Sequence, residues 1–577
     1  MASQDVTSSA DNMDLCDRIQ ESFPRSRGAI YESRVCDLDS RSEKRIRQMT
    51  SAIRAKDQWM EKLKNPEIRN RWSEEAKQAS LTDAELAYAL DELDYYASLH
   101  PPGSNTFLSP VENVWYSDSL VDEDTERELK KYTAIMEDVP ESAKDWHPGS
   151  NEQVLNLIHP SLYPLVYERT RVMKEPIASP KEALDCGTLG EVPGSIQKLN
   201  DFVCEHFKDA SDPKRSQYHV LGPAGSEIPR GFSTSTKFCW LPSEFRVDAN
   251  GKTTIDSYIN NLHPIKHASF YPVVANIFSR FVPLLEQVLT DLVHPIGRRV
   301  DTNCSWYSEE EFEFEGSDDD DYSNKYEEWQ ENRNFYEPQP GVFEAPKRPL
   351  VPYSLQGRRL QAIVKMSSIV LTPEKPEYTG GSWHVEALTT GLYYYDVENI
   401  TESNLAFREA VDPILLDYEQ GDSRGLSMVY DMFEDGVDDF VPVSQPLGQI
   451  EAKNGRCVVF PNTYQHRVSG FKLADPTKPG HRKIFAFFFI DPSTRIPSTE
   501  IVPPQQLSWW TGSKTNYAGL ANTFPSIVQD IIIDNLDFLI TEEQAKTIRL
   551  DLMDERKNRA AGIDEDLFEP GFSFCEH

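Results

Sequence analysis

Apolar residues recur every three or four positions in the first part of the chain, and this spacing predicts helices over residues 41–98. The first series consists of Ile46, Met49, Ile53, Trp59 and Leu63. The spacing returns in LTDAELAYALDELDYYASL, where Thr82 is expected to cap the helix N-terminus. The sequence HPPG at 100–103 then predicts the end of this helical region.

Three further local signals lie in the middle and at the end of the chain. The strand-like runs FCWLPSEFRVD and TTIDSYI flank DANGK, and an Asn-Gly pair in this setting predicts a β-hairpin. The apolar stripe of residues 273–293 predicts an amphipathic helix. Thr541 and Gln544 form a capping-box pattern, which predicts a helix that runs to about residue 560.

The pattern changes to strands between residues 351 and 510. The strand-like runs are LQAIVKMSSIVL, GLYYYDV, GRCVVFPN and KIFAFFFID. Each is short, rich in β-branched or aromatic residues, and bounded by Gly, Pro, Asn or Asp. Because no regular helices separate them, these runs predict a β-sandwich or a barrel. The chain as a whole is therefore predicted to be α+β.

Composition adds the size of the interior and the sign of the surface charge. The 577 residues are 39% hydrophobic and 11% aromatic, which is enough for a sizeable core. A net charge of -35 will repel nucleic acids and anionic membranes. Residues 308–345 are strongly acidic and poor in aliphatic side chains. They predict an exposed insertion or loop, with a site for a basic partner as the alternative.

The cysteines and the first residues bear on the compartment. The eight cysteines lie far apart and form no CxxC pair, which argues against zinc ribbons and fits reduced thiols. The start of the chain has no basic segment followed by an apolar one, and no run approaches the ~20 apolar residues of a membrane helix. We therefore expect a soluble intracellular protein, cytoplasmic or nuclear, that binds neither nucleic acid nor membranes.

One HxE triplet, His384-Val385-Glu386, lies in the strand-rich half of the chain. Residues i and i+2 of a strand point to the same face, so this imidazole and carboxylate can hold one metal ion from one side. They are half of the facial triad of two histidines and one carboxylate. The triplet alone is a weak signal, because a chain with 94 acidic residues and 12 histidines gives roughly two HxD or HxE matches by chance.

A second histidine and a cation follow in the order that such a site needs. His466 lies just after the strand-like run at 456–460. Arg482 begins the next strand, and its planar guanidinium suits a co-substrate carboxylate. On that strand it shares one face with three apolar residues, as a barrel interior requires: Ile484, Ala486 and Phe488. The alternatives for the cationic role are Arg467, His481 and Lys483.

The order HxE, His, Arg in a strand-rich segment is typical of the double-stranded β-helix, or jelly roll, of iron(II)- and 2-oxoglutarate-dependent oxygenases. It predicts iron(II) bound by His384, Glu386 and His466, and 2-oxoglutarate bound by Arg482. Two interpretations remain beside it. In one, the histidines are hydrogen-bonded core residues and Arg482 forms a salt bridge. In the other, the metal chemistry is that of a zinc hydrolase or a cupin-like site.

Several residues near the triplet carry weaker signals. Of the three consecutive tyrosines at 393–395, one or two should point inward, and Tyr394 is the candidate for hydrogen bonding to the co-substrate. Aromatic core packing is the alternative for the tyrosines. Trp383 and Asn462 flank the ligands and could shape the pocket.

Three basic residues outside this group are expected to be structural. His147 and His159 each precede a proline, and a structural hydrogen bond is expected there rather than a metal. Lys365 is expected at an exposed strand edge, with an inward, ionic position as the alternative. The chain contains neither the phosphate-binding pattern GxxxxGK[ST] nor the hydrolase pattern GxSxG.

The sequence resembles a fungal family that is defined by a large domain of unknown function (domain of unknown function 4246). The resemblance covers roughly residues 40–560. It is carried by KDWHPGSNEQVLNLIHPSLYPLVYERTRV, INNLHP, PEKPEYTGGSWHVEA, YYYDVENITES, VVFPNTYQHRV and GHRKIFAFFFIDPSTRIPSTEIVPPQQ. The HxE and distal His of this family look like those of the oxygenase superfamily, which implies that His384, Glu386 and His466 are ligands.

One departure from the family pattern lies beside the triplet. Family members usually have Gly after the Glu, and then an Asn-Glu-x-Ile-like segment before the tyrosine-rich strand. Here Ala387 leads through Gly391 straight into that strand, so several residues are missing. Their loss could shorten a strand or remove part of the site wall. A non-catalytic binding or scaffold protein on the same fold, with a degenerate metal site, is therefore the alternative function.

These signals divide the chain into five predicted parts. They are a polar lead-in (1–40), a helical and mixed region that packs on the core (41–300), an acidic insertion (301–345), the jelly-roll core with the metal site (346–510) and a C-terminal helical segment (511–577). The predicted function is hydroxylation of a small-molecule or protein substrate. No signal identifies the substrate or the oligomeric state.

Overall fold

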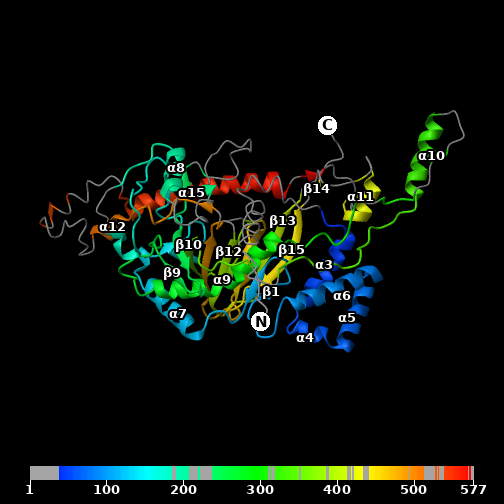
Figure 1. Cartoon of the computed structure of the whole chain (residues 1–577), viewed down its shortest axis with the longest axis horizontal. Coiled ribbons are helices and arrows are strands. Elements are labelled where there is room, and N and C mark those ends of the chain that lie inside the picture. Colours follow the sequence, from blue (N-terminus) through cyan, green and yellow to red (C-terminus); the bar gives the residue numbers. More distant parts are fainter. Residues whose placement is uncertain are drawn as a thin grey trace, which may run out of the picture.

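Ten strands join into one antiparallel sheet at the centre of the computed structural model (Figure 1). The structure describes residues 38–184, 190–206, 219–220, 235, 237–303, 305–308, 312–313, 319–349, 353–384, 389–411, 418, 422–432, 441–442, 444–492, 494–511, 525, 527–528, 531, 539–569 and 571–572. Helices lie around the sheet, so the architecture is mixed α+β with antiparallel sheets, as the hydrophobic pattern predicts.

The main sheet has the order β1-β2-β16-β12-β19-β10-β4-β3, and β8 and β9 extend it from β10. Its strands are β1 (Phe107–Leu108), β2 (Trp115–Ser117), β3 (Asp145–Trp146), β4 (Val154–Ile158), β8 (Ser243–Val247), β9 (Thr253–Ile255), β10 (Arg359–Leu371), β12 (Thr389–Glu398), β16 (Cys457–Pro461) and β19 (Gly480–Phe489). The four strands β10, β12, β16 and β19 come from the predicted strand-rich segment. The N-terminal half supplies the other strands and thereby completes the sheet.

A smaller antiparallel sheet has the order β15-β13-β17. Its strands are β13 (Asn404–Ala410), β15 (Ser444–Glu451) and β17 (Gln465–Val468). Short pairs are formed by β5 (Leu165–Val166) with β7 (Phe238–Cys239), β6 (His219–Val220) with β20 (Thr494–Arg495), β11 (Glu377–Tyr378) with β18 (Phe471–Lys472), and β14 (Val441–Pro442) with β21 (Gly571–Phe572). The β6–β20 pair is parallel.

The helices gather at the N-terminus and around the main sheet (Figure 1). They are α3 (Arg41–Arg54), α4 (Trp59–Leu63), α5 (Pro66–Gln78), α6 (Asp83–Ser98), α7 (Glu123–Glu137), α8 (Ile196–His206), α9 (Tyr271–Val293), α10 (Asp319–Asn332), α11 (Ser423–Tyr430), α12 (Leu507–Thr511) and α15 (Glu542–Ile563). The predicted helical region thus forms α3 to α6. Thr82 caps α6 through a complete capping box, and Thr541 caps α15 in the same way. The predicted hairpin is the β8–β9 pair.

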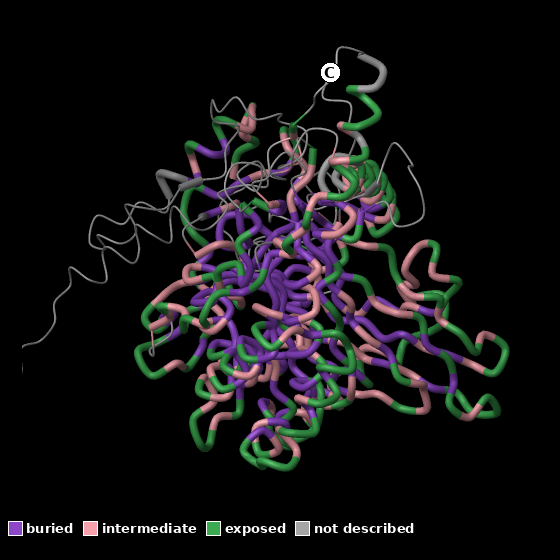
Figure 2. The backbone as a smooth tube through the Cα atoms, turned by 90° about the vertical axis from the view of Figure 1, so that its right-hand side faces the viewer, coloured by how far each residue is buried: buried purple, intermediate pink, exposed green. Residues whose placement is uncertain are grey.

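Helix α9 covers one face of the main sheet. The rings of Phe278 and Phe281 pack against Phe487 of β19, with centroids 5.2 and 5.5 Å apart. Among the described helices, α9 alone is long and apolar enough to cross a membrane, yet 61% of that stretch is buried inside the protein. Figure 2 shows that buried backbone gathers in the middle of the molecule. The buried residues of α9 include Val274, Leu285 and Leu292, so α9 packs as a core helix.

The other face of the same strands looks toward the smaller sheet. Along β19 the side chains alternate, with Phe485, Phe487 and Phe489 in the core cluster of α9. Ile484 instead packs with residues of β13 and β15, while Ala486 and Phe488 pack with Leu552 of α15. We call this second side the inner face, and Arg482 belongs to it by strand parity, as predicted.

The acidic insertion differs from the predicted loop. Its described part contains helix α10, which stands away from the body of the molecule (Figure 1). Tyr322, Tyr326 and Trp329 lie three and four residues apart on this helix, and all three rings pack around Phe312. This local aromatic cluster stabilises a helix in a segment whose charge alone favours a loop.

Candidate functional site

The structure brings two predicted ligands, His384 and His466, into direct contact. His466 lies on β17. His384 follows β11 and forms an isolated antiparallel bridge with His466. Each backbone N–H donates to the carbonyl oxygen of the other residue, at 3.2 and 3.1 Å. The centroids of the two imidazole rings are 4.1 Å apart. Two side chains that are 82 positions apart in the sequence therefore face one small volume.

The surroundings leave one ring nitrogen of each histidine without a hydrogen-bond partner among the described residues. The Nδ1 of His384 lies 3.0 Å from the carbonyl oxygen of Ser382. With the proton on Nδ1, this contact leaves the Nε2 lone pair available. His466 is 4% exposed, and its Nδ1 has no hydrogen-bond partner among the described residues. Burial, followed by the charges of His384 and Lys365, holds the pKa of His466 well below its ordinary value.

Glu386, the third predicted ligand, lies outside the described residues, as do Val385, Ala387 and Leu388. Within the described part of the chain, no group of three or more His, Cys, Asp or Glu side chains is placed to hold a metal ion. The strand that follows is β12 (Thr389–Glu398). β12 starts at Thr389, which pairs with Pro461 on one side and Phe489 on the other.

Arg482 is a fully buried cation without a carboxylate partner among the described residues. Its exposed fraction is 0%. The guanidinium donates from Nη1 to the Ser403 hydroxyl at 2.7 Å, while Nε and Nη2 have no acceptor in the part of the chain that the structure describes. It lies 4.4 Å from the ring centroid of Phe471 and 5.7 Å from that of Tyr394. Burial lowers the pKa of Arg482. A planar donor pair in a dry cage of this kind suits a bound carboxylate.

The alternatives for the cationic role are placed differently. Arg467 is exposed and stacks on the Trp383 ring at 4.7 Å. His481 lies 3.0 Å from a carboxylate oxygen of Asp396. Lys483 is 3.0 Å from a carboxylate oxygen of Glu137, on the face of the sheet opposite to Arg482. Each alternative is therefore exposed or already beside an acid. Ser403 escaped prediction because it lies 79 positions before Arg482, with no local signal.

The three tyrosines of β12 divide between the two faces. Tyr394 is 1% exposed and joins the inner cluster beside Arg482. Tyr393 and Tyr395 join the core on the α9 side, where Tyr395 Oη lies 3.0 Å from the hydroxyl oxygen of Thr133. One tyrosine thus faces the predicted co-substrate position and two are core residues.

Of the two flanking residues, Asn462 is buried and Trp383 packs against arginines of the smaller sheet. Asn462 is 4% exposed and accepts a hydrogen bond from the Thr390 hydroxyl at 3.1 Å, whereas its Nδ2 has no acceptor among the described residues. Trp383 lies between two arginines, with the guanidinium carbons of Arg408 and Arg467 each 4.7 Å from its ring. The indole is therefore held in place immediately before His384.

The prediction for Lys365 was wrong. β10 is not an edge strand, because it pairs with β19 on one side and with β4 and β8 on the other. Lys365 stands opposite Ala486 and thus points to the inner face. The predicted edge rested on the charge of one residue in an apolar run, which says nothing about long-range pairing. His147 and His159 lie close to each other, with ring centroids 5.4 Å apart.

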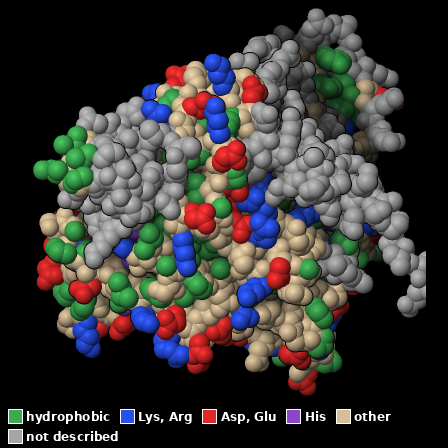
Figure 3. Space-filling model, turned by 60° about the vertical axis from the view of Figure 1, so that its left-hand side comes forward, with side chains coloured by type: hydrophobic (Ala, Val, Ile, Leu, Met, Phe, Trp, Pro, Cys, Tyr) green, Lys and Arg blue, Asp and Glu red, His purple; other side chains and the backbone are tan. Residues whose placement is uncertain are grey.

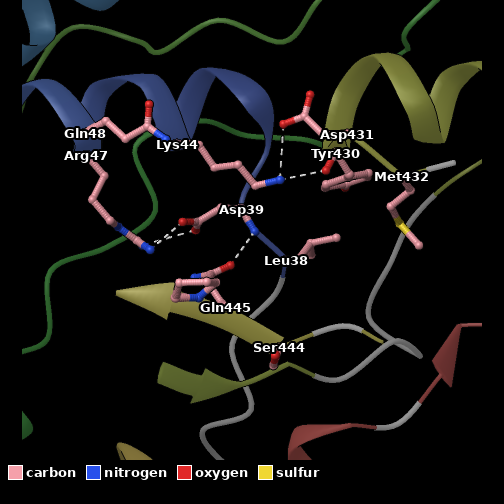
Figure 4. A pocket seen from close by; sticks show the side chains of 11 residues that line it. Leu38, Asp39, Lys44, Arg47, Gln48, Tyr430, Asp431, Met432, Ser444 and Gln445 are labelled. Atoms are coloured by element: carbon pink, nitrogen blue, oxygen red, sulfur yellow. Dashed lines mark hydrogen bonds and ion pairs between the residues drawn. The ribbon is translucent and has the colours of Figure 1, made fainter. Parts of the chain in front are cut away.

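A pocket of about 360 Å³ lies elsewhere, between α3, α11 and β15 (Figure 4). Asp39 forms an ion pair with Arg47 at 2.5 Å and donates its backbone N–H to Gln445 Oε1 at 2.8 Å. Lys44 donates to the carbonyl oxygen of Tyr430 at 2.7 Å. The charged groups of this pocket already have partners, and no predicted site residue lines it.

Comparison with known families identifies the chain at the family level. The model of one family, described as a protein of unknown function (DUF4246), matches residues 83–513. The chain belongs to this family. The match contains all the predicted site residues of this DUF4246 protein and is shorter at both ends than the predicted resemblance. No curated protein matches the sequence.

Solved structures give only distant matches to this DUF4246 protein. One is an Fe(II)/(alpha)ketoglutarate-dependent dioxygenase, TqaL, at 11% identity and a TM-score of 0.19, over 43% of this chain and 66% of that chain. A bsmA homolog from Methylobium petroleophilum matches at 10% identity and a TM-score of 0.14, over 24% of this chain and 45% of that chain. IDO from Bacillus thuringiensis matches at 11% identity and a TM-score of 0.14, over 30% of this chain and 55% of that chain. The chain spans less than two thirds of each of these structures.

Proposed function

We propose that the two sheets are the halves of a jelly roll. The chain alternates between them, since β10, β12, β16 and β19 lie in the main sheet while β13, β15 and β17 lie in the smaller one. The main sheet pairs these strands in the order β16-β12-β19-β10. On the smaller side, β11 pairs with β18, and His384 continues that pairing to β17. Such interleaving of first and last strands is what a double-stranded β-helix requires.

We propose that the protein is an iron(II)- and 2-oxoglutarate-dependent oxygenase that hydroxylates a small molecule or a protein side chain. The observation that carries this proposal is the pairing of His384 and His466 beside one another on the inner side of the fold. His384, Glu386 and His466 would hold iron(II) from one side and leave positions open. When bound, iron(II) with 2-oxoglutarate and oxygen supplies the oxidising chemistry.

The residues of the chain then have distinct tasks. The hydrogen bond from His384 Nδ1 to the Ser382 carbonyl oxygen orients one ligand, and the packing of His466 on Phe460, with ring centroids 4.7 Å apart, orients the other. Arg482 would orient the distal carboxylate of 2-oxoglutarate through its free Nε and Nη2 donors. The rings of Tyr394 and Phe471 keep water away from that ion pair, which strengthens it.

The test is anaerobic titration with iron(II), followed by admission of air in the presence of 2-oxoglutarate and measurement of succinate. We expect iron binding and succinate formation by the wild type. His384→Ala should lower iron affinity at least tenfold and abolish succinate formation. His267→Ala serves as the control, because His267 lies outside the strand-rich segment and outside every predicted site.

Each result has a separate meaning. Iron affinity that is equal in the wild type and in His384→Ala would contradict the ligand assignment. Metal binding with no dependence on 2-oxoglutarate would favour a zinc-hydrolase type of site. A wild type that binds no iron would favour the scaffold alternative, to which the short segment after Glu386 points.

A further inference from the structure

Lys365 is an inward-facing lysine in the middle of a central strand. On β10, Met366 stands opposite Ile158 of β4, and both belong to the core on the α9 side. The neighbouring positions, Lys365 and His159, therefore project together to the inner face. Lys365 is half-buried, and it has no hydrogen bond or ion pair to any residue that the structure describes.

The groups around Lys365 are hydrogen-bond donors and cations. His159 is 4% exposed, and its Nδ1 accepts the backbone N–H of Ser161 at 3.3 Å, so Nε2 carries the proton of the neutral ring. The ring of His147 lies 5.4 Å from it. Asp145, an acid near His147, is already engaged by Arg549 of α15 at 2.6 Å. Among the described residues, the surroundings thus offer protons and positive charge but no available carboxylate.

The charge of Lys365 reaches both this cluster and the metal ligand. After burial, its positive charge is a cause of the lowered pKa of His159, of His147 and of His466. The register of β10 places Lys365 on the inner face, opposite Ala486. His466 reaches the same face, because its ring packs on Phe460 of the inner cluster.

An unpartnered inward cation is unusual for this molecule. The chain has 94 acidic and 59 basic residues, and on the face shown in Figure 3 basic side chains lie among acidic ones. Placing an ammonium group in the interior without a counter-charge costs free energy. Trp240 and Leu552 cover the inner face next to it at Ile363, so the lysine is not simply a solvated surface residue.

We infer that Lys365, with His159 beside it, forms an anion-binding subsite on the inner face, and that the substrate presents a carboxylate or a phosphate group there. The role as a substrate subsite rests on the proposed oxygenase function, whereas anion binding by itself does not. Ammonium and neutral imidazole N–H donors together bind one oxyanion by charge-assisted hydrogen bonds. Arg482 lies on β19 opposite Ile369, four positions along β10 from Lys365, so the two cations serve different anions.

The test uses inorganic phosphate and butyrate as probes, each titrated calorimetrically into the full-length protein. The wild type is compared with Lys365→Met and with Lys483→Met. Lys483→Met is the matched control. It removes a lysine from the opposite face of the same sheet, where Lys483 pairs with Glu137. We expect the wild type and Lys483→Met to bind at least one probe equally, and Lys365→Met to bind it at least tenfold more weakly. The probe that binds more tightly shows whether the subsite prefers a phosphate or a carboxylate group.

Several outcomes would overturn the inference. They are a wild type that binds neither probe, and a Lys365→Met variant that binds as the wild type does. Lys365→Gln keeps a polar side chain of similar reach and is used if the Met variant does not fold.

A titration with 2-oxoglutarate in the presence of iron(II) under argon separates this inference from the proposed function. Lys365→Met should keep the 2-oxoglutarate affinity of the wild type, while Arg482→Met should lose it. An equal loss in Lys365→Met would assign the lysine to the co-substrate and overturn the inference. If the wild type itself binds no 2-oxoglutarate, the proposed function fails, and the phosphate and butyrate titrations still decide the role of Lys365.

Discussion

At the residue scale, the predicted site residues of the inner face carry buried polar atoms that no described residue bonds. Arg482 Nε and Nη2, His466 Nδ1 and Asn462 Nδ2 are all buried without a partner among the described residues. Buried donors and acceptors are normally satisfied, because leaving one unpaired costs about 1 to 3 kcal/mol. A ligand bound at the inner face would give these four atoms partners and so offset the cost of leaving them unpaired.

This explanation predicts that Arg482 does not stabilise the ligand-free protein. Replacing it with Met removes a buried, unpaired charge, so Arg482→Met should leave the free energy of unfolding unchanged or raise it by about 1 kcal/mol. The variant should also lose 2-oxoglutarate binding. Arg495→Met is the control, because Arg495 is equally buried but pairs with Glu244 at 3.0 Å. The free energy of unfolding of Arg495→Met should fall by about 3 to 5 kcal/mol. Urea unfolding compares the two, and equal destabilisation would make Arg482 a structural residue.

His100 predicts a pH dependence of stability at a site away from the inner face. Its Nδ1 lies 3.2 Å from the Thr106 carbonyl oxygen, and its Nε2 accepts the backbone N–H of Leu108 at 3.4 Å, so both nitrogens are used by the neutral ring. Burial lowers the pKa of His100 to about 4. Because the folded pKa lies below the unfolded value near 6.5, this stability is complete above pH 6.5 and is lost as the pH falls toward 4.

The expected loss between pH 7.5 and pH 5.5 is about 1.4 kcal/mol from this one group. Thermal unfolding of the wild type and of His100→Gln over this range measures it, since glutamine cannot gain a proton. The difference in stability between the two proteins should shrink as the pH falls. A difference that stays constant with pH would show that His100 does not titrate between the folded and unfolded states.

At the element scale, the sequence predicted what depends on near neighbours. The N-cap at Thr82, the capping box at Thr541, the β8–β9 hairpin and helix α9 are all confirmed, because each is encoded within one turn or one amphipathic stretch. The pairing of β4 with β10 was missed, since Asn156 and Ser367 come together only through the whole fold. For the same reason the inward direction of Lys365 was only the alternative prediction, whereas the period of two along β19 placed Arg482 on the correct face.

The contact between α9 and β12 predicts a steric limit at Gly391. A Cβ at this position would lie 2.8 Å from the ring of Phe281 and 3.2 Å from that of Phe489. Gly391→Ala should therefore force α9 away from the sheet and cost about 1 to 3 kcal/mol. Gly341→Ala is the control, because nothing lies within 4 Å of its added Cβ. Thermal unfolding of both variants tests the contact, and unchanged stability of Gly391→Ala would mean that α9 moves freely over the sheet.

At the scale of the whole molecule, the N-terminal helices are fastened to the sheet-bearing body by buried charges. Arg299 lies between Glu43 of α3 and Glu92 of α6, each at 2.8 Å, and also pairs with Glu112, which lies between β1 and β2. The side chain of Arg299 is 2% exposed. One cation thus joins two helices and the end of the main sheet, so this part of the chain should act as one unit with the core rather than as a separate domain.

Removal of this cation should therefore loosen the whole N-terminal region. Arg299→Met would leave three carboxylates buried together without a counter-charge, which should cost about 3 to 5 kcal/mol. Arg280→Met is the control, because Arg280 pairs with Asp122 at the surface, with side chains 48% and 46% exposed, and should change stability by about 0.5 kcal/mol or less. Hydrogen exchange of α3 and α6, together with urea unfolding, measures the effect. If these helices lose protection while the main sheet keeps it, the N-terminal region is a separate unit after all; loss of protection in both supports a single cooperative body.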